Sequence, residues 1–212
     1  MYDYIFYDWN GTLLDDTDIC VDILNTMLTK RGYQQITKEK YLDIFTFPIK
    51  EYYRLAGFDF EKEEYEIIAQ DFAPLYNANY TKCKLFDGAK AFLDNAKKHG
   101  IKQIIISATE SNLLNEQLKF FQIDDYFNDR IALNNYYAYG KTELAKQFVK
   151  ANGIDVSKVI MIGDTIHDAE VADAIGCECL LLTCGHQSKT RLAACNKKTF
   201  NSLTEINNYI LR

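Results

Sequence analysis

Three aspartates, a serine and a lysine follow short apolar runs of this sequence, at points where strands are expected to end. They are Asp8, Ser107, Lys141, Asp164 and Asp168. Carboxylate oxygens are the hard ligands that Mg²⁺ prefers, while a hydroxyl and an ammonium group can hold phosphate oxygens. A carboxylate can also attack phosphorus and form an aspartyl-phosphate. If the fold brings these side chains together, the set predicts metal-assisted phosphoryl transfer.

Each of these residues also has a simpler interpretation when it is taken alone. An aspartate after a strand often caps a helix, and Asp164 and Asp168 could merely favour the dipole of the helix that follows them. Ser107 could be a turn residue, and Lys141 could be a solvated residue at a helix start. The catalytic interpretation therefore depends on a fold that places all of them at one edge.

Strands and helices alternate along the chain from residue 87 onward. Apolar runs predict strands at 101–106, 130–133, 159–162 and 179–182, with helices between them. This alternation is typical of an α/β fold, here a Rossmann-like, doubly wound parallel sheet with helices on both faces. Residues 4–7 predict a first strand that joins the same sheet. Because ligands bind beyond the carboxyl ends of parallel strands, the candidate residues are expected to meet there.

Residues 17–80 show apolar residues at helical spacing and no strand pattern. They predict an all-helical cap domain inserted after the first strand. Its helices are expected at 17–30, from Thr37, at 49–56 and at 61–80, with a kink at Pro74. We therefore predict a catalytic core of residues 1–15 and 83–212, a helical cap of residues 16–82, and hinges at 14–17 and 82–87.

The composition narrows the classes of partner and location. The chain has 48% hydrophobic and 25% charged residues, which is ordinary globular composition. Its net charge of −6 gives a nucleic acid no electrostatic attraction. No apolar run reaches the roughly 18 residues of a membrane span, and the start MYDYIFYDWN lacks the pattern of a secretory signal. We therefore expect a cytoplasmic monomer or homodimer, with its six cysteines reduced.

Four segments resemble the motifs of the haloacid dehalogenase-like superfamily, in the usual order. They are DWNGTLLDD, IIISATES, GKTE and GDTIHDAEVA. The helical insertion resembles the small cap of that family. TFPIKEYY in the cap and TCGHQSKTRL near the end look most like the phosphoglycolate phosphatase-like branch. The resemblance implies an Mg²⁺-dependent phosphatase that acts on a small phosphorylated metabolite.

The resemblance also implies roles for particular residues. Asp8 would be the nucleophile and a metal ligand, and position 10 would give the metal its backbone carbonyl. Asp164 would be a metal ligand, directly or through water. Asp168 would support the metal or Lys141.

The phosphate group would be held by a second set of residues. Ser107 and Lys141 would bind its oxygens, with Ala108 beside them. Gly11 permits a sharp turn that could expose backbone N–H groups to the phosphate. All of these residues lie within the quoted motifs.

Position 10 departs from the family's pattern. Phosphatases of this superfamily usually read D-x-D, where the second aspartate protonates the leaving group and then activates water, but this chain has Asn10. An amide can donate a hydrogen bond and cannot exchange a proton near neutral pH. Metal and phosphate binding should survive. The loss of general acid–base help is expected to cost about 10²–10⁴-fold in rate.

Three interpretations of Asn10 follow, and we favour the first. The chain is a slow phosphatase, or one that prefers good leaving groups such as acyl and aryl phosphates. Alternatively, it is a regulatory protein that binds a phosphorylated ligand, with vestigial catalysis. The third is a phosphonatase-like hydrolase of carbon–phosphorus bonds, since such enzymes resemble D-W-A-G-T here, which makes Trp9 suggestive. That chemistry needs a cap lysine for a Schiff base, and Lys50 is the candidate.

The cap is expected to determine substrate specificity. Candidate residues around its helix at 49–56 are Phe47, Lys50, Tyr53 and Arg54. Lys50 and Arg54 would form a basic pair for a second anionic group, or else a solvated helix face. The Phe and Tyr residues between 41 and 60 favour a cap core because of their helical spacing. His167 lies between Asp164 and Asp168 in the sequence. It either contacts the site directly or lies behind the site residues or on the surface.

Overall fold

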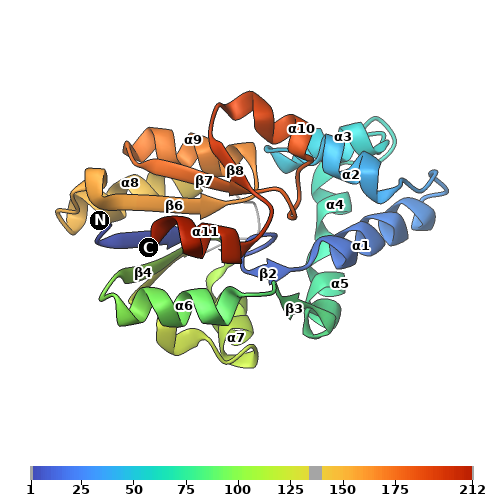
Figure 1. Ribbon diagram of the computed structural model, residues 1–212. Helices are drawn as coiled ribbons and strands as arrows, with labels where there is room; N and C mark the ends of the chain where they lie inside the picture. Colours follow the sequence, from blue (N-terminus) through green and yellow to red (C-terminus); the bar gives the residue numbers. More distant parts are fainter. Residues whose placement is uncertain (1, 134–139, 212) are drawn as a thin grey trace.

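A six-stranded sheet lies at the centre of the computed structural model, which describes residues 2–133 and 140–211 (Figure 1). The strands are β1 (Tyr4–Tyr7), β4 (Lys102–Glu110), β5 (Asp129–Leu133), β6 (Val159–Gly163), β7 (Glu178–Leu182) and β8 (Lys198–Phe200). Their order is β5-β4-β1-β6-β7-β8, and all neighbouring pairs are parallel. The predicted α/β fold is confirmed, and the first strand lies where the strand order reverses.

Helices cover both faces of this sheet. The first face carries α6 (Ala89–Lys98), α7 (Ser111–Phe120) and α11 (Leu203–Ile210), and the second carries α8 (Lys141–Ala151) and α9 (Ile166–Ile175) (Figure 1). Successive side chains of a strand point to opposite faces. Ile5 and Tyr7 of β1 therefore join the first cluster, and Phe6 joins the second. This burial on both faces explains the continuous apolar runs of the strands.

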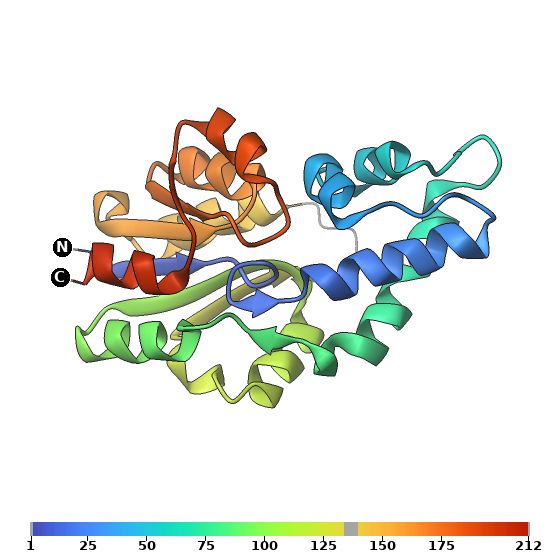
Figure 2. The ribbon, with the colours of Figure 1, turned by 45° about the vertical axis from the view of Figure 1, so that its right-hand side comes forward.

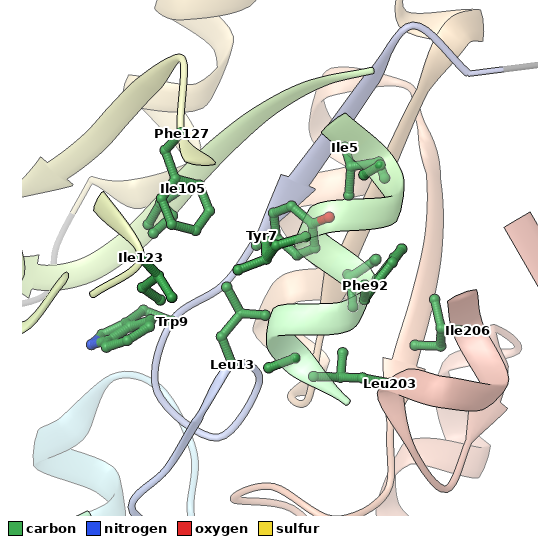
Figure 3. Close-up of a cluster of buried hydrophobic side chains, with 14 of the residues drawn as sticks. Ile5, Tyr7, Trp9, Leu13, Phe92, Ile105, Ile123, Phe127, Leu203 and Ile206 are labelled. Carbon is green, nitrogen blue, oxygen red and sulfur yellow. The ribbon is translucent and has the colours of Figure 1, made fainter. Parts of the chain in front are cut away.

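Figure 3 shows the apolar cluster on the first face. Phe92 of α6 packs edge to face against Tyr7 of β1, with ring centroids 5.7 Å apart. Trp9 is fully buried in the same cluster, and its Nε1 donates a hydrogen bond of 2.6 Å to Gln117 Oε1. Trp9 is therefore a core residue directly between Asp8 and Asn10, and it anchors the turn that follows β1.

The helices that follow the first strand lie together beside the sheet (Figure 2). They are α1 (Thr17–Lys30), α2 (Lys38–Ile44), α3 (Ile49–Ala56), α4 (Tyr65–Gln70) and α5 (Phe72–Asn79). They share a separate buried cluster that includes Leu24, Met27, Tyr41 and Ile68. Two short strands, β2 (Leu14–Asp15) and β3 (Lys84–Leu85), pair antiparallel within the predicted hinge segments. The domain boundaries themselves stay predictions.

The expected helix at 61–80 was wrong in its extent. The structure has two helices there, separated at Asp71. Pro74 lies in the first turn of α5, and it has no N–H to donate to the carbonyl of Gln70. Continuing α4 through this point would leave that carbonyl without a partner, so α4 ends and a new helix begins.

Several short elements carry no sequence signal of the kind used above. They are β2, β3, β8, α10 (Lys189–Leu192) and the last part of β4. Strand β4 was expected to end at Ile106, but it continues to Glu110 with a shift of register between Ile106 and Glu110. Three of the four added residues, Ser107, Thr109 and Glu110, are polar, so the apolar pattern ends before the strand does. The extension lies at the edge of the sheet where ligands bind.

No helix within residues 2–133 and 140–211 is both long and apolar enough to cross a membrane. The cytoplasmic location stays a prediction. So does the choice between a monomer and a homodimer.

Replacing Phe92 by Ala should lower the free energy of unfolding by about 3–5 kcal/mol, because it removes a fully buried ring from the first cluster. Urea unfolding followed by circular dichroism would measure this. Phe120→Ala is the matched control, since Phe120 is 49% exposed and should change stability much less. Equal losses in the two variants would contradict the assignment of Phe92 to the core.

Candidate active site

Lys141 joins two of the predicted carboxylates at the carboxyl edge of the sheet. Its Nζ lies 2.6 Å from Asp8 Oδ1 and 2.7 Å from Asp168 Oδ1. All three side chains are buried. Asp8 follows β1, Lys141 begins α8 and Asp168 lies in the first turn of α9. The fold thus brings together residues that are 133 and 27 positions apart in the sequence.

Asp168 is held in place by the start of its own helix. Its Oδ2 accepts hydrogen bonds from Asp164 N at 3.1 Å, Thr165 N at 3.0 Å and Thr165 Oγ1 at 2.8 Å. Thr165 and Asp168 form a capping box. A side chain at Gly163 would collide with Asp168, so glycine is required there. The capping geometry leaves the Oδ1 of Asp168 aimed at Lys141.

Asp164 completes a group of three carboxylates. Its Oδ1 accepts a hydrogen bond of 2.8 Å from Thr12 Oγ1, and its Oδ2 accepts one of 2.7 Å from His186 N. One oxygen each of Asp8, Asp164 and Asp168 lies within 4.8 Å of the others. A side chain at Gly11 or at Gly185 would run into Asp164, so both glycines are needed for this close approach. The oxygen donors fit a hard divalent cation.

Burial and mutual repulsion set the charges of this carboxylate group. Burial raises the pKa of Asp8 above its usual range, and Lys141 offsets only part of that rise. Burial also raises the pKa of Asp164. It acts in the same direction on Asp168, but the charge of Lys141 and the hydrogen bonds from Lys141 and Thr165 together outweigh burial and hold that pKa below the usual range. A bound divalent cation would favour the ionised form of each carboxyl group. Both the negative charge and the oxygen donors of the group are therefore compatible with such an ion.

Asn10 makes hydrogen bonds at both ends of its amide. Its Nδ2 donates to Asp16 Oδ2 and to Tyr76 Oη, each at 2.6 Å. Its Oδ1 accepts a hydrogen bond of 2.7 Å from Thr109 Oγ1. Asn10 therefore connects the turn after β1 with β4 and with helix α5 of the cap. Both amide hydrogens are used within the protein.

Asp16 and His186 form a buried ion pair that the sequence did not predict. His186 Nε2 lies 3.1 Å from Asp16 Oδ1, and His186 Nδ1 lies 2.8 Å from Tyr41 Oη. Burial acts to lower the pKa of His186. The charge of Asp16, its hydrogen bond and the charges of Asp164 and Asp8 together outweigh burial and raise that pKa to about 9. Burial acts to raise the pKa of Asp16, but His186 and hydrogen bonds hold it below the usual range. Asp16 is the last residue of DWNGTLLDD and His186 lies in TCGHQSKTRL, so both belong to segments quoted above, but neither residue was singled out.

The residues predicted to bind the phosphate group have different surroundings. Ser107 is buried, and its Oγ accepts a hydrogen bond of 3.0 Å from Thr109 N. Ala108 and Thr109 line the cavity described below. Gly11 has a φ of +68°, as its turn requires. The N–H of Gly11 donates to Leu14 O at 2.9 Å and to Asp16 Oδ1 at 3.0 Å, so it stabilises its own turn.

A cavity of about 220 Å³ lies between these residues and the cap. Asp8, Asn10, Lys141 and Asp168 line it on the core side. The cap supplies an aromatic wall that includes Phe45, Phe47, Tyr52, Tyr53, Tyr65 and Phe72. Several of the Phe and Tyr residues expected to be cap core, among them Phe45, Phe47, Tyr52 and Tyr53, therefore line the cavity as well. His167 also lines the cavity, with its ring centroid 4.7 Å from that of Phe47.

Two of the four cap candidates do not line this cavity. Lys50 is exposed, and its Nζ lies 5.6 Å from the ring centroids of both Phe60 and Tyr65. Arg54 is exposed as well and pairs with Glu51 through two hydrogen bonds. The expected basic pair facing the substrate is therefore not formed, because α3 turns its buried face, with Tyr52 and Tyr53, toward the cavity.

Comparison with known proteins gives the family. Residues 5–182 match the family described as haloacid dehalogenase-like hydrolase, so the chain belongs to that family. A relative named "Putative pyrophosphatase PpaX", from Caldanaerobacter subterraneus subsp. tengcongensis, is 25% identical over 134 residues. That match covers 62% of this chain and 58% of the relative, less than two thirds of its length.

Two further comparisons cover more of the chain. The phosphoglycolate phosphatase of Aliivibrio fischeri is 21% identical over 194 residues, which are 86% of this chain and 84% of that protein. The solved structure of the haloacid dehalogenase-like family hydrolase SP0104 from Streptococcus pneumoniae has a TM-score of 0.85 at 17% identity and covers 98% of each chain. The structural match shows the fold. The family match shows a haloacid dehalogenase-like hydrolase.

Replacing Lys141 by Met should lower the free energy of unfolding at pH 8 by about 3–5 kcal/mol, because it leaves the buried Asp8 and Asp168 carboxylates without their cation. Urea unfolding in the absence of divalent metal would measure the loss. Lys146→Met, on the exposed side of the same helix, is the matched control, since its pair with Glu143 is exposed to solvent. A loss no larger than that of the control would contradict the buried ion pair.

The His186–Asp16 pair should make stability depend on pH. The folded pKa of His186, about 9, lies above the 6.5 of an ordinary imidazole. The stabilisation is therefore complete below pH 6.5 and disappears as the pH rises through about 9. We expect the stability difference between the native protein and His186→Gln to shrink from pH 6 to pH 10 in urea unfolding. The exposed His99→Gln should show no such trend, and a constant difference for His186→Gln would argue against the pair.

Proposed function

We propose that this chain is an Mg²⁺-dependent phosphatase that acts on a small phosphorylated metabolite through an aspartyl-phosphate at Asp8. The observation that carries the proposal is the position of Asp8. Its carboxyl group lies at the base of the cavity, bonded to Lys141 and close to two further carboxylates. Family membership supports the same chemistry. A nucleophile, a cation and a metal-binding group in one place are what phosphoryl transfer needs.

In this proposal Asp8 attacks phosphorus with one carboxylate oxygen. Lys141 holds a phosphate oxygen and Asp168 keeps Lys141 oriented, which the hydrogen bonds of Asp168 support. Asp8, Asp164 and the backbone carbonyl of Asn10 would hold Mg²⁺. The ion, when bound, would offset the repulsion between the carboxylate and the phosphate. Ser107, Ala108 and Gly11 would contact the phosphate once the substrate is in place.

The relatives' names suggest two substrates, pyrophosphate and phosphoglycolate. Each would bring a second anionic group into the cavity. The exposed positions of Lys50 and Arg54 do not support a partner for that group. The proposed substrate is therefore a small phosphorylated metabolite, without a second anionic group assigned to it.

The regulatory alternative has one observation in its favour, which is Asn10. A binding protein needs the phosphate and metal contacts without general acid–base chemistry, and an amide is compatible with that. The phosphonatase-like alternative has no such support. Lys50 does not line the cavity and lies over the rings of Phe60 and Tyr65, and Trp9 is part of the hydrophobic core.

Replacing Asp8 by Asn should abolish the Mg²⁺-dependent hydrolysis of acetyl phosphate, because the amide is a poor nucleophile toward phosphorus. Turnover is measured as phosphate release with Mg²⁺ and again after chelation with EDTA. Asp3→Asn is the matched control, since Asp3 is an exposed residue at the other end of β1. Turnover that survives in Asp8→Asn would overturn the proposed nucleophile.

The Asn10→Asp variant separates the phosphatase from the regulatory alternative. If the native protein is a slow phosphatase, kcat should rise by about 10²-fold, the lower end of the range for general acid–base catalysis. The gain is limited because Asp16 Oδ2 lies 2.6 Å from the Asn10 amide nitrogen, so two carboxyl groups would have to share a proton. A native protein that is inert while Asn10→Asp turns over would favour the regulatory alternative.

A further inference from the structure

We propose that the preferred substrates are small aryl phosphate monoesters, whose ring occupies the aromatic cavity while the phosphate meets Asp8. This inference rests on the proposed phosphatase function and names its substrate class. Two independent features support it. One is the chemistry of the cavity wall, and the other is the lack of a free proton donor beside Asn10.

The cavity wall on the cap side is apolar and aromatic. Phe47, Tyr53, Tyr65 and Phe72 contribute rings, and Ala69 and Ala73 leave space between them. Aromatic rings favour offset or edge-to-face contact with another ring, which adds about 0.5–1.5 kcal/mol beyond the burial of area. Asp8 and Lys141 line the same cavity. A ring bound against the aromatic wall can therefore carry a phosphate group that reaches the nucleophile.

The charges of the wall disfavour a second anionic group on the substrate. Among the described residues that line the cavity, the cap contributes no lysine or arginine. Asp16 and Glu110 are acidic, and His167 on the core side already lies 3.2 Å from Glu170 Oε2. His186 also lines the cavity, but it is paired with Asp16. A carboxylate or a second phosphate would therefore lose hydration without gaining an unpaired cation from the cap. An uncharged ring avoids that cost.

The hydrogen-bond donors near position 10 are already engaged. Asn10 uses its two amide hydrogens on Asp16 and Tyr76, and Tyr76 Oη in turn donates to Asp16 Oδ2 at 2.7 Å. His186 has Asp16 at one ring nitrogen and Tyr41 at the other. The network around Asn10 therefore supplies no acid to the departing oxygen, which must leave without a proton from this side of the cavity. A phenol, with a pKa of about 10, leaves far more easily in this way than an alkyl alcohol does.

Hydrolysis of an aryl phosphate would take place in two steps, transfer of the phosphoryl group to Asp8 and then hydrolysis of the aspartyl-phosphate. A carboxylate oxygen of Asp8 forms a bond to phosphorus, the P–O(aryl) bond breaks, and its electron pair leaves on the phenolate, which takes a proton from solvent water. Water then attacks the same phosphorus atom, the bond to Asp8 breaks, and the second proton of the attacking water passes to solvent. Inorganic phosphate and a phenol are the products. Neither step needs an acid at position 10.

A substrate panel on the native protein with Mg²⁺ tests the inference. It comprises phenyl phosphate, cyclohexyl phosphate, phosphoglycolate and acetyl phosphate. Phenyl phosphate should exceed cyclohexyl phosphate in kcat/KM by at least about 10²-fold, because the two rings are alike in size and differ in leaving group. Phenyl phosphate should also exceed phosphoglycolate. In Asn10→Asp the preference for phenyl over cyclohexyl phosphate should shrink, since a carboxyl group can then protonate the alcohol.

Ala73→Trp tests the location of the ring, because an indole at this position would fill the cavity. The variant should lower kcat/KM for phenyl phosphate by at least tenfold relative to that for acetyl phosphate, which has no ring to accommodate. Ile67→Trp is the matched control. Ile67 is 50% exposed on the neighbouring helix and is not among the residues that line the cavity, so its ratio should equal that of the native protein.

The outcomes distinguish this inference from the proposed function. If acetyl phosphate is hydrolysed through Asp8 but phosphoglycolate or cyclohexyl phosphate matches phenyl phosphate, the phosphatase stands and the aryl specificity is overturned. An unchanged ratio in Ala73→Trp would overturn the location of the ring. If the native protein hydrolyses none of the four compounds, the proposed function and the inference fail together.

Discussion

The ammonium group of Lys141, buried between Asp8 and Asp168, is the interaction on which the site depends. It joins the end of β1 to the first turn of α9, and it is supplied by the first residue of α8. Removing such charges from water is costly, so both pairs must be well formed. Each neighbouring constraint serves this geometry: the capping box fixes Asp168, and Gly163 makes room for its side chain.

The sequence could predict this part of the molecule because parallel strands end at one edge. Asp8 and Asp164 directly follow apolar strands, so recognising those strands was enough to place the residues together. The same reasoning did not find the His186–Asp16 pair, whose members are 170 positions apart and do not directly follow a strand: His186 comes four residues after β7, and Asp16 follows the turn after β1. Helical spacing indicated that the aromatic residues of α3 are buried, but it could not show that this same face, rather than the one with Lys50, lines the cavity.

The hydrogen-bond network around Asp16 gives the cap a fixed relation to the core. Tyr76 of α5 donates to Asp16, and Tyr41 of α2 lies against His186, which belongs to the segment after β7. Gln187 Nε2 also donates to Phe45 O at 2.8 Å. A cap held by buried polar contacts on two sides differs from one that only touches the core through its hinges, because moving it would leave charged groups unpaired.

The amide at position 10 is consistent with this network in a way that a carboxylate would not be. Asp16 accepts hydrogen bonds from Asn10, Tyr76, Gly11 and His186, and a second negative charge beside it would be repelled in a buried environment. The same network that stabilises the cap therefore removes a proton donor from the cavity. A site built in this way can be efficient only if its substrate supplies a good leaving group. The aromatic wall favours such a substrate, because it binds an aryl ring next to the nucleophile.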